Sequence, residues 1–272
     1  MASDRPLILI VGGGWHTPAN YGRLIHALEA AGHQVHCPRH PSMNGDRPPT
    51  AGFADDVRSL RAYVERLVDD GRHILALMHS YGGQVGTEAL HGLSAQGRAK
   101  QGKMGGIVNL VYMCAYALLE GHSSEARLLH TLDNANTVLV IDKVKEMGNE
   151  DLLPLVFDFT EDNNVLCRDA KAIFFEQSGA SDEEVQEYLS QLVVWNGQCM
   201  YERVAKSAWR DIPTTYIHTT KDMTVPITYQ KSMVETIEKE DREVRTFKLD
   251  AGHCPNLTAT RGIVGIIDEL MK

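Results

Sequence analysis

The sequence lacks any surplus of positive charge. Its 272 residues hold 27 lysines and arginines against 36 aspartates and glutamates, which gives a formal net charge of −9 at pH 7. Binding to a phosphate backbone requires a basic field, so we expect no nucleic-acid partner.

Long hydrophobic runs are also missing. No stretch approaches the roughly 20 apolar residues that cross a bilayer. The first residues, MASDRPLILIVGGG, are without the longer apolar region and the small-residue cleavage site of a signal peptide. We therefore expect no membrane partner and a cytoplasmic location.

Paired cysteines and metal-ligand spacings are absent. The five cysteines are scattered without a C-x-x-C pair, which predicts reduced thiols instead of a disulfide framework or a zinc site. The twelve histidines include no H-E-x-x-H spacing. We predict neither a metal site nor a cofactor.

What the chain does contain is an ordinary globular composition, with 43% hydrophobic and 23% charged residues, in a length that suits one large domain. Short apolar runs alternate with helical periodicity. This alternation predicts an α/β fold with a mostly parallel central sheet and helices on both faces. The predicted strands are 7–11, 33–38, 73–78, 107–114, 214–219 and 244–249, and the predicted helices are 21–31, 53–70, 84–93 and 263–271.

The alternation stops between residues 115 and 211. Helix-like pieces occur at 125–132 and 183–194, but there is little strand pattern, and the region is too long for a loop. The segment NTVLVIDKV fits a strand or a helix, and both remain open. We predict a core formed by residues 1–114 and 212–272, with a predominantly helical cap or lid inserted at 115–211.

The stretch LALMHSYGGQVGTEAL places a serine between an apolar run and a helical pattern. Taken alone, Ser80 is either an ordinary helix N-cap or a nucleophile on a sharp strand-to-helix corner. Such a corner needs small neighbours, which Gly82 and Gly83 supply. The chain resembles the α/β-hydrolase family, whose G-x-S-x-G pattern corresponds here to M-H-S-Y-G, with Met78 in place of the first glycine. The resemblance runs from Leu7 to the last helix, except for the cap, and implies that Ser80 is the nucleophile.

The same resemblance implies a base and an acid in later loops. A serine hydroxyl needs a base within hydrogen-bond reach. FKLDAGHCPNL puts His253 before the final helix, where the family has its catalytic histidine. The family's acid follows a late strand, and IPTTYIHTTKDMTVP offers Asp222 there, to orient the His253 imidazole. Glu120 and Asp250 remain open as competing acids.

Donors for a developing oxyanion are expected from two backbone segments. The family uses the amide of the residue after the serine, which is Tyr81 here, and an amide after the first strand, which is Gly13 or Gly14 here. The run G-G-G-W-H lacks the G-x-G-x-x-G spacing of a dinucleotide-binding loop. An oxyanion hole is therefore the function that we expect of this loop.

Aromatic and histidine side chains flank the predicted site. We expect Trp15, His16, His79 and Trp195 to line the substrate pocket, although a core position for Trp15 or His16, or local packing for His79, remains open. The cap aromatics fit either an apolar roof over the substrate or helical packing, and packing is the interpretation that we favour for most of them. These are Phe174, Phe175, Tyr188, Trp195 and Trp209.

The function that these features predict is a serine hydrolase acting on a carboxylic ester or lactone. GWHTPANYGRLIHALEAAGHQV and DAGHCPNLT resemble the branch of small-ester methylesterases and hydroxynitrile lyases, many of which act on aromatic or polyketide-like molecules of secondary metabolism. Two alternatives stay open. The same three side chains could serve carbon–carbon bond cleavage, lyase or cyclisation chemistry, or the fold could bind a small molecule without catalysis. The expected partner is a small-molecule substrate, and a homodimer is left open.

Overall fold

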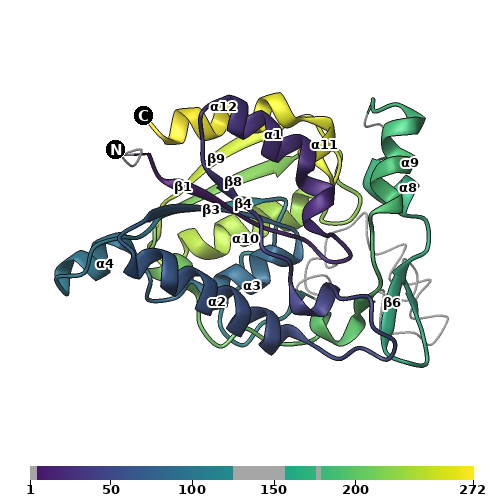
Figure 1. The fold of residues 1–272 in the computed structure, drawn as a ribbon, viewed down its shortest axis with the longest axis horizontal. Helices are drawn as coiled ribbons and strands as arrows, with labels where there is room; N and C mark the ends of the chain where they lie inside the picture. The colour runs from purple at the N-terminus through teal and green to yellow at the C-terminus, as the bar shows by residue number, and fades with distance from the viewer. Residues whose placement is uncertain (1–4, 125–156, 176–178) are drawn as a thin grey trace.

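One parallel sheet of six strands forms the centre of the molecule. A computed structural model describes residues 5–124, 157–175 and 179–272. The strand order is β2-β1-β3-β4-β8-β9, and every neighbouring pair is parallel (Figure 1). This confirms the predicted α/β architecture. The strands are β1 Leu7–Val11, β2 Val35–His36, β3 His73–His79, β4 Gly106–Met113, β8 Thr214–Thr219 and β9 Val244–Leu249.

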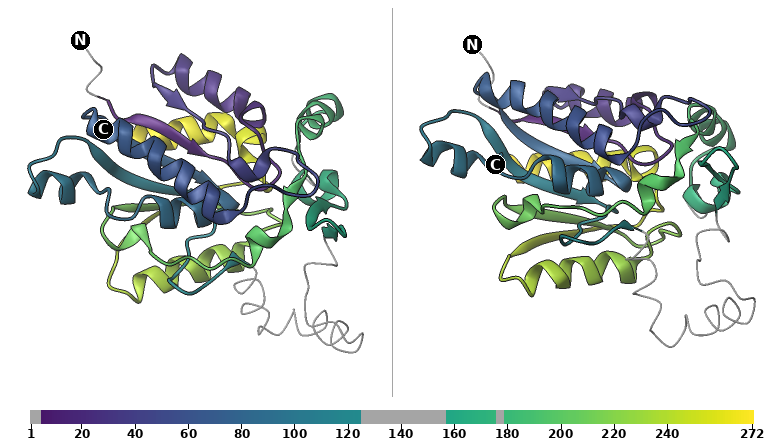
Figure 2. Two further views of the ribbon diagram at one scale, coloured as in Figure 1. Left: turned by 60° about the horizontal axis from the view of Figure 1, so that its bottom comes forward. Right: turned by 90° about the horizontal axis from the view of Figure 1, so that it is seen from below.

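Helices cover both faces of this sheet because its central strands are apolar on both sides. In β1, Leu7 and Leu9 face the core beneath α2, α3 and α10, whereas Ile8 and Ile10 face the core beneath α1 and α12. Figure 2 shows these two layers on opposite sides of the strands. The helices of the core are α1 Gly22–Ala30, α2 Phe53–Asp69, α3 Tyr81–Ala89, α4 Ala95–Lys100, α10 Ile227–Glu238, α11 Pro255–Thr258 and α12 Thr260–Leu270.

Most predicted elements occur within a few residues of their expected bounds. The bounds of α3 differ, and helices α4, α10 and α11 have no predicted counterpart. Helix α3 begins at Tyr81 instead of residue 84, because its first turn contains two glycines, which are poor helix formers and hide the pattern. Helix α10 was not predicted, although Tyr229, Met233 and Ile237 form its buried face.

The region predicted as a cap contains strands as well as helices. Its described part has helices α8 (Ala170–Phe175) and α9 (Asp182–Ser190). It also has an antiparallel sheet of β5 (Phe157–Phe159), β6 (Asn164–Cys167) and β7 (Trp195–Asn196), which was not predicted. Strands of two to four residues are too short to give a period-two pattern. The predicted helix at 125–132 and the segment NTVLVIDKV lie outside the described residues, and the division into core and cap stays a prediction.

The parallel sheet brings the predicted site residues to one edge. Ser80, Asp222 and His253 follow the carboxyl ends of β3, β8 and β9, and the glycine run follows β1. Helices α8 and α9 and strand β6 lie beyond this edge (Figure 1). Carboxyl ends of parallel strands are the usual place for a ligand in such sheets. Within the described residues, no helix is long and apolar enough to cross a membrane.

Candidate functional site

Ser80 lies on a strained corner between β3 and α3. Its φ of 52° and ψ of −124° lie in a region that residues with side chains rarely adopt. The segment at the end of β4 holds this conformation. The Ser80 amide donates to the Met113 carbonyl at 3.4 Å, and the Tyr116 amide donates to the Ser80 carbonyl at 3.2 Å. A helix N-cap alone does not require such strain.

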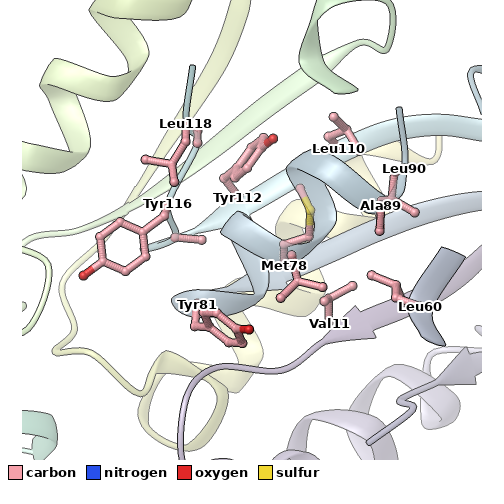
Figure 3. Packing of buried hydrophobic residues seen from close by; sticks show 14 of the residues in the cluster. Val11, Leu60, Met78, Tyr81, Ala89, Leu90, Leu110, Tyr112, Tyr116 and Leu118 are labelled. Atoms are coloured by element: carbon pink, nitrogen blue, oxygen red, sulfur yellow. The ribbon is translucent and has the colours of Figure 1, made fainter. Parts of the chain in front are cut away.

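Small residues around the corner allow the close packing that it needs. A Cβ at Gly82 would lie less than 3.0 Å from the Val11 carbonyl, and one at Gly83 would meet the Tyr116 backbone at 2.7 Å. Met78 stands where the family pattern has glycine, and its sulfur occupies the space left open by Gly86 of α3. Figure 3 shows Met78 in the buried cluster beneath this helix.

The three side chains predicted to act together are hydrogen-bonded in series. His253 Nε2 lies 2.9 Å from Ser80 Oγ, and His253 Nδ1 lies 2.9 Å from Asp222 Oδ2 and 3.1 Å from Asp222 Oδ1. All three residues are buried. With Nδ1–H donated to the carboxylate, the unprotonated Nε2 is free to accept the serine proton.

Further donors fix the Asp222 carboxylate. Its Oδ1 accepts from the amides of Thr224 and Val225, both at 2.8 Å, and its Oδ2 accepts from the Thr219 hydroxyl at 3.0 Å. These bonds hold the carboxylate in its orientation toward His253.

The two competing acids lie in ion pairs elsewhere. Asp250 is exposed and bonds to Thr220 and Lys221. Glu120 pairs with Arg210, and the hydrogen bonds from that guanidinium lower the pKa of Glu120 to about 2. Neither hydrogen-bonds to His253, so Asp222 is the acid that the fold brings to it.

Three buried imidazoles gather behind the serine, and only one of them has a carboxylate partner. The His79 ring lies 5.0 Å from the His253 ring and 5.3 Å from the His16 ring. Burial is the main reason that the pKa of His16 falls to about 3 and that the pKa of His79 lies well below its usual value. His16 and His79 are therefore expected to be neutral near pH 7.

One group of possible metal ligands occurs among the described residues. The ligand atoms of His79, Cys114 and His253 lie within 4.8 Å of one another. However, His79 Nε2–H and the Cys114 thiol both donate to the His253 carbonyl oxygen, at 2.8 and 3.4 Å. Burial also raises the pKa of the Cys114 thiol well above its usual value, which disfavours the thiolate that metal binding needs. This cluster therefore supports the position of His253.

The two amides predicted as oxyanion donors after β1, those of Gly13 and Gly14, differ in their surroundings. The Gly13 amide donates to the Tyr21 hydroxyl at 2.8 Å, so it is already engaged. The Gly13 carbonyl accepts from the His16 amide at 3.3 Å, and in a trans peptide the next N–H points the opposite way. Gly14 is thus the better donor of the pair. Tyr81 begins α3, where the first-turn amides have no acceptor within the helix.

A small cavity of about 20 Å³ opens beside Ser80, and most of its walls are aromatic or apolar. Trp15 and Trp195 line it as predicted, together with the proposed donor residues Gly14 and Tyr81. The predicted pocket residues His16 and His79 are not among its lining residues, because they pack behind the glycine loop. Other lining residues gave no signal in the sequence, and these are Tyr116, Ser124, Phe157, Met200 and Thr224.

The remaining cap aromatics are packed side chains. Trp209 is fully buried and donates from its indole to the Leu118 carbonyl at 2.8 Å. Phe175 contacts Tyr188 with ring centroids 5.1 Å apart. Phe174 lies beside a predicted catalytic side chain, with its ring centroid 5.6 Å from that of His253. Of these aromatics, only Trp195 lines the cavity, so packing is the main role of the set.

Similarity to known proteins extends over nearly the whole chain. Residues 7–265 match the model of the Alpha/beta hydrolase family. A curated protein of Phoma sp., probable hydrolase R7, is 26% identical over 275 residues and is matched over 98% of both chains. An extracellular alpha/beta-hydrolase from a Paenibacillus species has a TM-score of 0.69 at 17% identity, over 98% of this chain and 100% of its own. The methylesterase MES16 from Arabidopsis has a TM-score of 0.67 at 16% identity, over 97% and 98%.

Proposed function

Because the chain belongs to the alpha/beta hydrolase family and is a hydrolase of that family, we propose that it is a serine hydrolase that cleaves a carboxylic ester or lactone of a small apolar or aromatic molecule. The observation that carries this proposal is the continuous contact from Ser80 Oγ through His253 to Asp222, at 2.9 Å for each of its two bonds. Such a series of side chains turns a weak alcohol nucleophile into an effective one.

The proposed reaction begins with Ser80 Oγ attacking the substrate carbonyl carbon while His253 Nε2 takes the hydroxyl proton. The carbonyl oxygen becomes an oxyanion, to which the amides of Gly14 and Tyr81 donate. Asp222 stabilises the imidazolium that forms on His253. The imidazolium then gives its proton to the leaving alcohol oxygen, and the ester C–O bond breaks to leave an acyl group on Ser80.

Water completes the proposed cycle. His253 takes a proton from a water molecule that attacks the acyl carbon, and the tetrahedral intermediate again places its oxyanion against the same two amides. Collapse of this intermediate returns the proton to Ser80 and releases the acid. In a lactone, the acid and the alcohol leave as one molecule.

The cavity supports a small apolar or aromatic substrate. Its side-chain walls include Trp15, Phe157, Trp195 and Met200, and small-ligand sites are usually lined by such apolar and aromatic side chains. Aromatic walls favour apolar and aromatic groups through offset and edge-to-face contacts. The fold shared with the Arabidopsis methylesterase is consistent with a small-ester substrate.

Labelling with a fluorophosphonate tests the nucleophile. We expect one adduct in the intact mass of the wild-type protein and none in Ser80→Ala. Ser124→Ala is the matched control, because Ser124 lines the same cavity but donates its hydroxyl to the Met200 carbonyl, and among the described residues it has no hydrogen bond to a base. An unlabelled wild type, or equal labelling of Ser80→Ala, contradicts the proposal.

Product analysis with a panel of aromatic methyl esters, lactones and β-keto esters then separates hydrolysis from lyase or cyclisation outcomes.

A further inference from the structure

A buried chain of hydrogen bonds joins the glycine loop to the loop that carries His253. The Gly13 amide lies 2.8 Å from Tyr21 Oη, which lies 2.7 Å from His79 Nδ1. On the other side of the same ring, His79 Nε2 lies 2.8 Å from the His253 carbonyl oxygen. Tyr21 and His79 are almost completely buried.

The direction of every bond in this chain is fixed. The His253 carbonyl can only accept, so His79 carries its proton on Nε2 and presents Nδ1 as an acceptor. The Tyr21 hydroxyl must then donate to that Nδ1, and it accepts from the Gly13 amide. Tyr21 Oη and the His79 ring each accept one of these bonds and donate one. Because the bonds point the same way, each one polarises the next.

The two ends of the chain belong to the two loops whose separation matters for the proposed reaction. Fixing the Gly13 amide fixes the start of the segment that presents the Gly14 amide. Fixing the His253 carbonyl limits movement of the backbone from which the proposed base reaches Ser80. His79 is the residue before the serine, so the connection passes directly behind the nucleophile.

We propose that Tyr21 and His79 are positioning residues, which hold the oxyanion loop and the His253 imidazole at a fixed separation on either side of Ser80. This inference rests on the proposed function, since the groups that it positions are the proposed donor and the proposed base. Neither residue lines the cavity, so the substrate does not contact them. Their removal is therefore expected to lower kcat more than it raises KM.

The neutral state of His79 is part of this role. A second cation beside His253 would oppose formation of the imidazolium during turnover. The titratable groups near the ring are Tyr21, His16, His253 and Cys114, and none of them is a carboxylate that would stabilise a protonated His79. Burial raises the pKa of the Cys114 thiol well above its usual value, so it carries no negative charge there. Desolvation lowers the pKa of His79 well below the usual value, so the ring stays a neutral connector.

Tyr21→Phe is the direct test, because it removes one hydroxyl and leaves the packed ring. Tyr63→Phe is the matched control. Tyr63 makes the same kind of bond, from its hydroxyl to His36 Nδ1 at 2.6 Å, but on α2 and away from the cavity. For each protein we would measure kcat and KM with a p-nitrophenyl ester, the rate of fluorophosphonate labelling, and the thermal midpoint.

We expect Tyr21→Phe to lower kcat and the labelling rate by at least about tenfold, with KM within about threefold of wild type. Tyr63→Phe should keep both rates within about twofold of wild type, whatever its effect on the thermal midpoint. A Tyr21→Phe protein with wild-type kcat and labelling rate overturns the inference, even if it is less stable.

A second variant keeps the test decisive if Tyr21→Phe folds poorly. His79→Gln retains a donor for the His253 carbonyl but offers Tyr21 no ring nitrogen. Its kcat should also fall, and the double variant should be no worse than the poorer single variant, because the residues act through one chain of bonds. Additive losses, or a His79→Gln protein as active as wild type, overturn the inference. A Ser80→Ala protein that keeps full activity instead overturns the proposed function itself.

Discussion

The sulfur of Met78 lies in the space that Gly86 leaves open on the inner face of α3, and a Cβ at Gly86 would come within 3.0 Å of it. The corner that holds Ser80 thus accommodates methionine in place of glycine because another glycine, Gly86 in the second turn of α3, leaves room for the larger side chain. The pair explains how the strand can depart from the family pattern while the corner keeps its shape.

Gly86→Ala should destabilise the protein. Overpacking of a filled core costs about 1–3 kcal/mol, which exceeds the benefit of about 1 kcal/mol from replacing glycine inside a helix. Urea unfolding measures the difference. Gly97→Ala in α4 is the control, because a Cβ there meets only ordinary contacts at 3.7 Å. Gly86→Ala should cost less in a Met78→Ala background than in the wild type, because the sulfur that it crowds is then absent. A Gly86→Ala protein more stable than wild type contradicts the packing account.

Asp222→Asn should lower kcat by about 10³–10⁴-fold while leaving the fold intact, because an amide stabilises the imidazolium far less than a carboxylate does. Asp250→Asn is the matched control, since that acid lies in the neighbouring loop and, within the described part of the chain, bonds to Thr220 and Lys221 and not to His253. Steady-state kinetics with one ester compares the two variants. A larger loss in Asp250→Asn would show that the proton relay uses the other acid.

Gly14→Ala should lower kcat/KM by about tenfold or more. A Cβ at Gly14 would lie 2.7 Å from the Trp195 ring, so the loop that carries the proposed donor must shift. The double variant with Gly14→Ala and Trp195→Phe lacks the crowded ring atoms and should recover part of the activity. Gly22→Ala provides the control, because a Cβ there meets nothing within 4 Å. Wild-type activity in Gly14→Ala would mean that the loop tolerates the shift and does not set the oxyanion geometry.

Acid should destabilise the fold through its buried imidazoles. The pKa of His16 falls from 6.5 to about 3 and that of His218 to about 4, mainly because burial disfavours their charged forms. Between pH 6.5 and 4 the unfolded chain therefore binds protons that the folded chain does not, and the free energy of unfolding decreases as pH falls. Urea unfolding at several pH values measures the slope. His16→Asn should reduce this slope, whereas replacing the exposed His73 by Asn should leave it unchanged, and equal slopes in wild type and His16→Asn would be evidence against this cause.

The sequence predicts the sheet and the meeting of Ser80, Asp222 and His253 because each side chain lies within a few residues of the end of a predicted strand, and parallel strands end at one edge. It does not predict that the Tyr21 hydroxyl accepts a hydrogen bond from the Gly13 amide, since that contact depends on how a short turn packs against a loop eight residues earlier. Strands β5, β6 and β7 are too short for a pattern. The outer walls of the cavity come from residues far apart in the chain, so Phe157 and Met200 carried no local signal.

The groups proposed to receive the negative charge are amides of the main chain, at Gly14 and Tyr81. No point substitution deletes a main-chain N–H, except one to proline. Inherited changes in side chains around the cavity can therefore alter its shape and its choice of ligand while the charge-stabilising dipoles remain. Proteins descended from such a chain can therefore change their substrate specificity before they change the type of reaction.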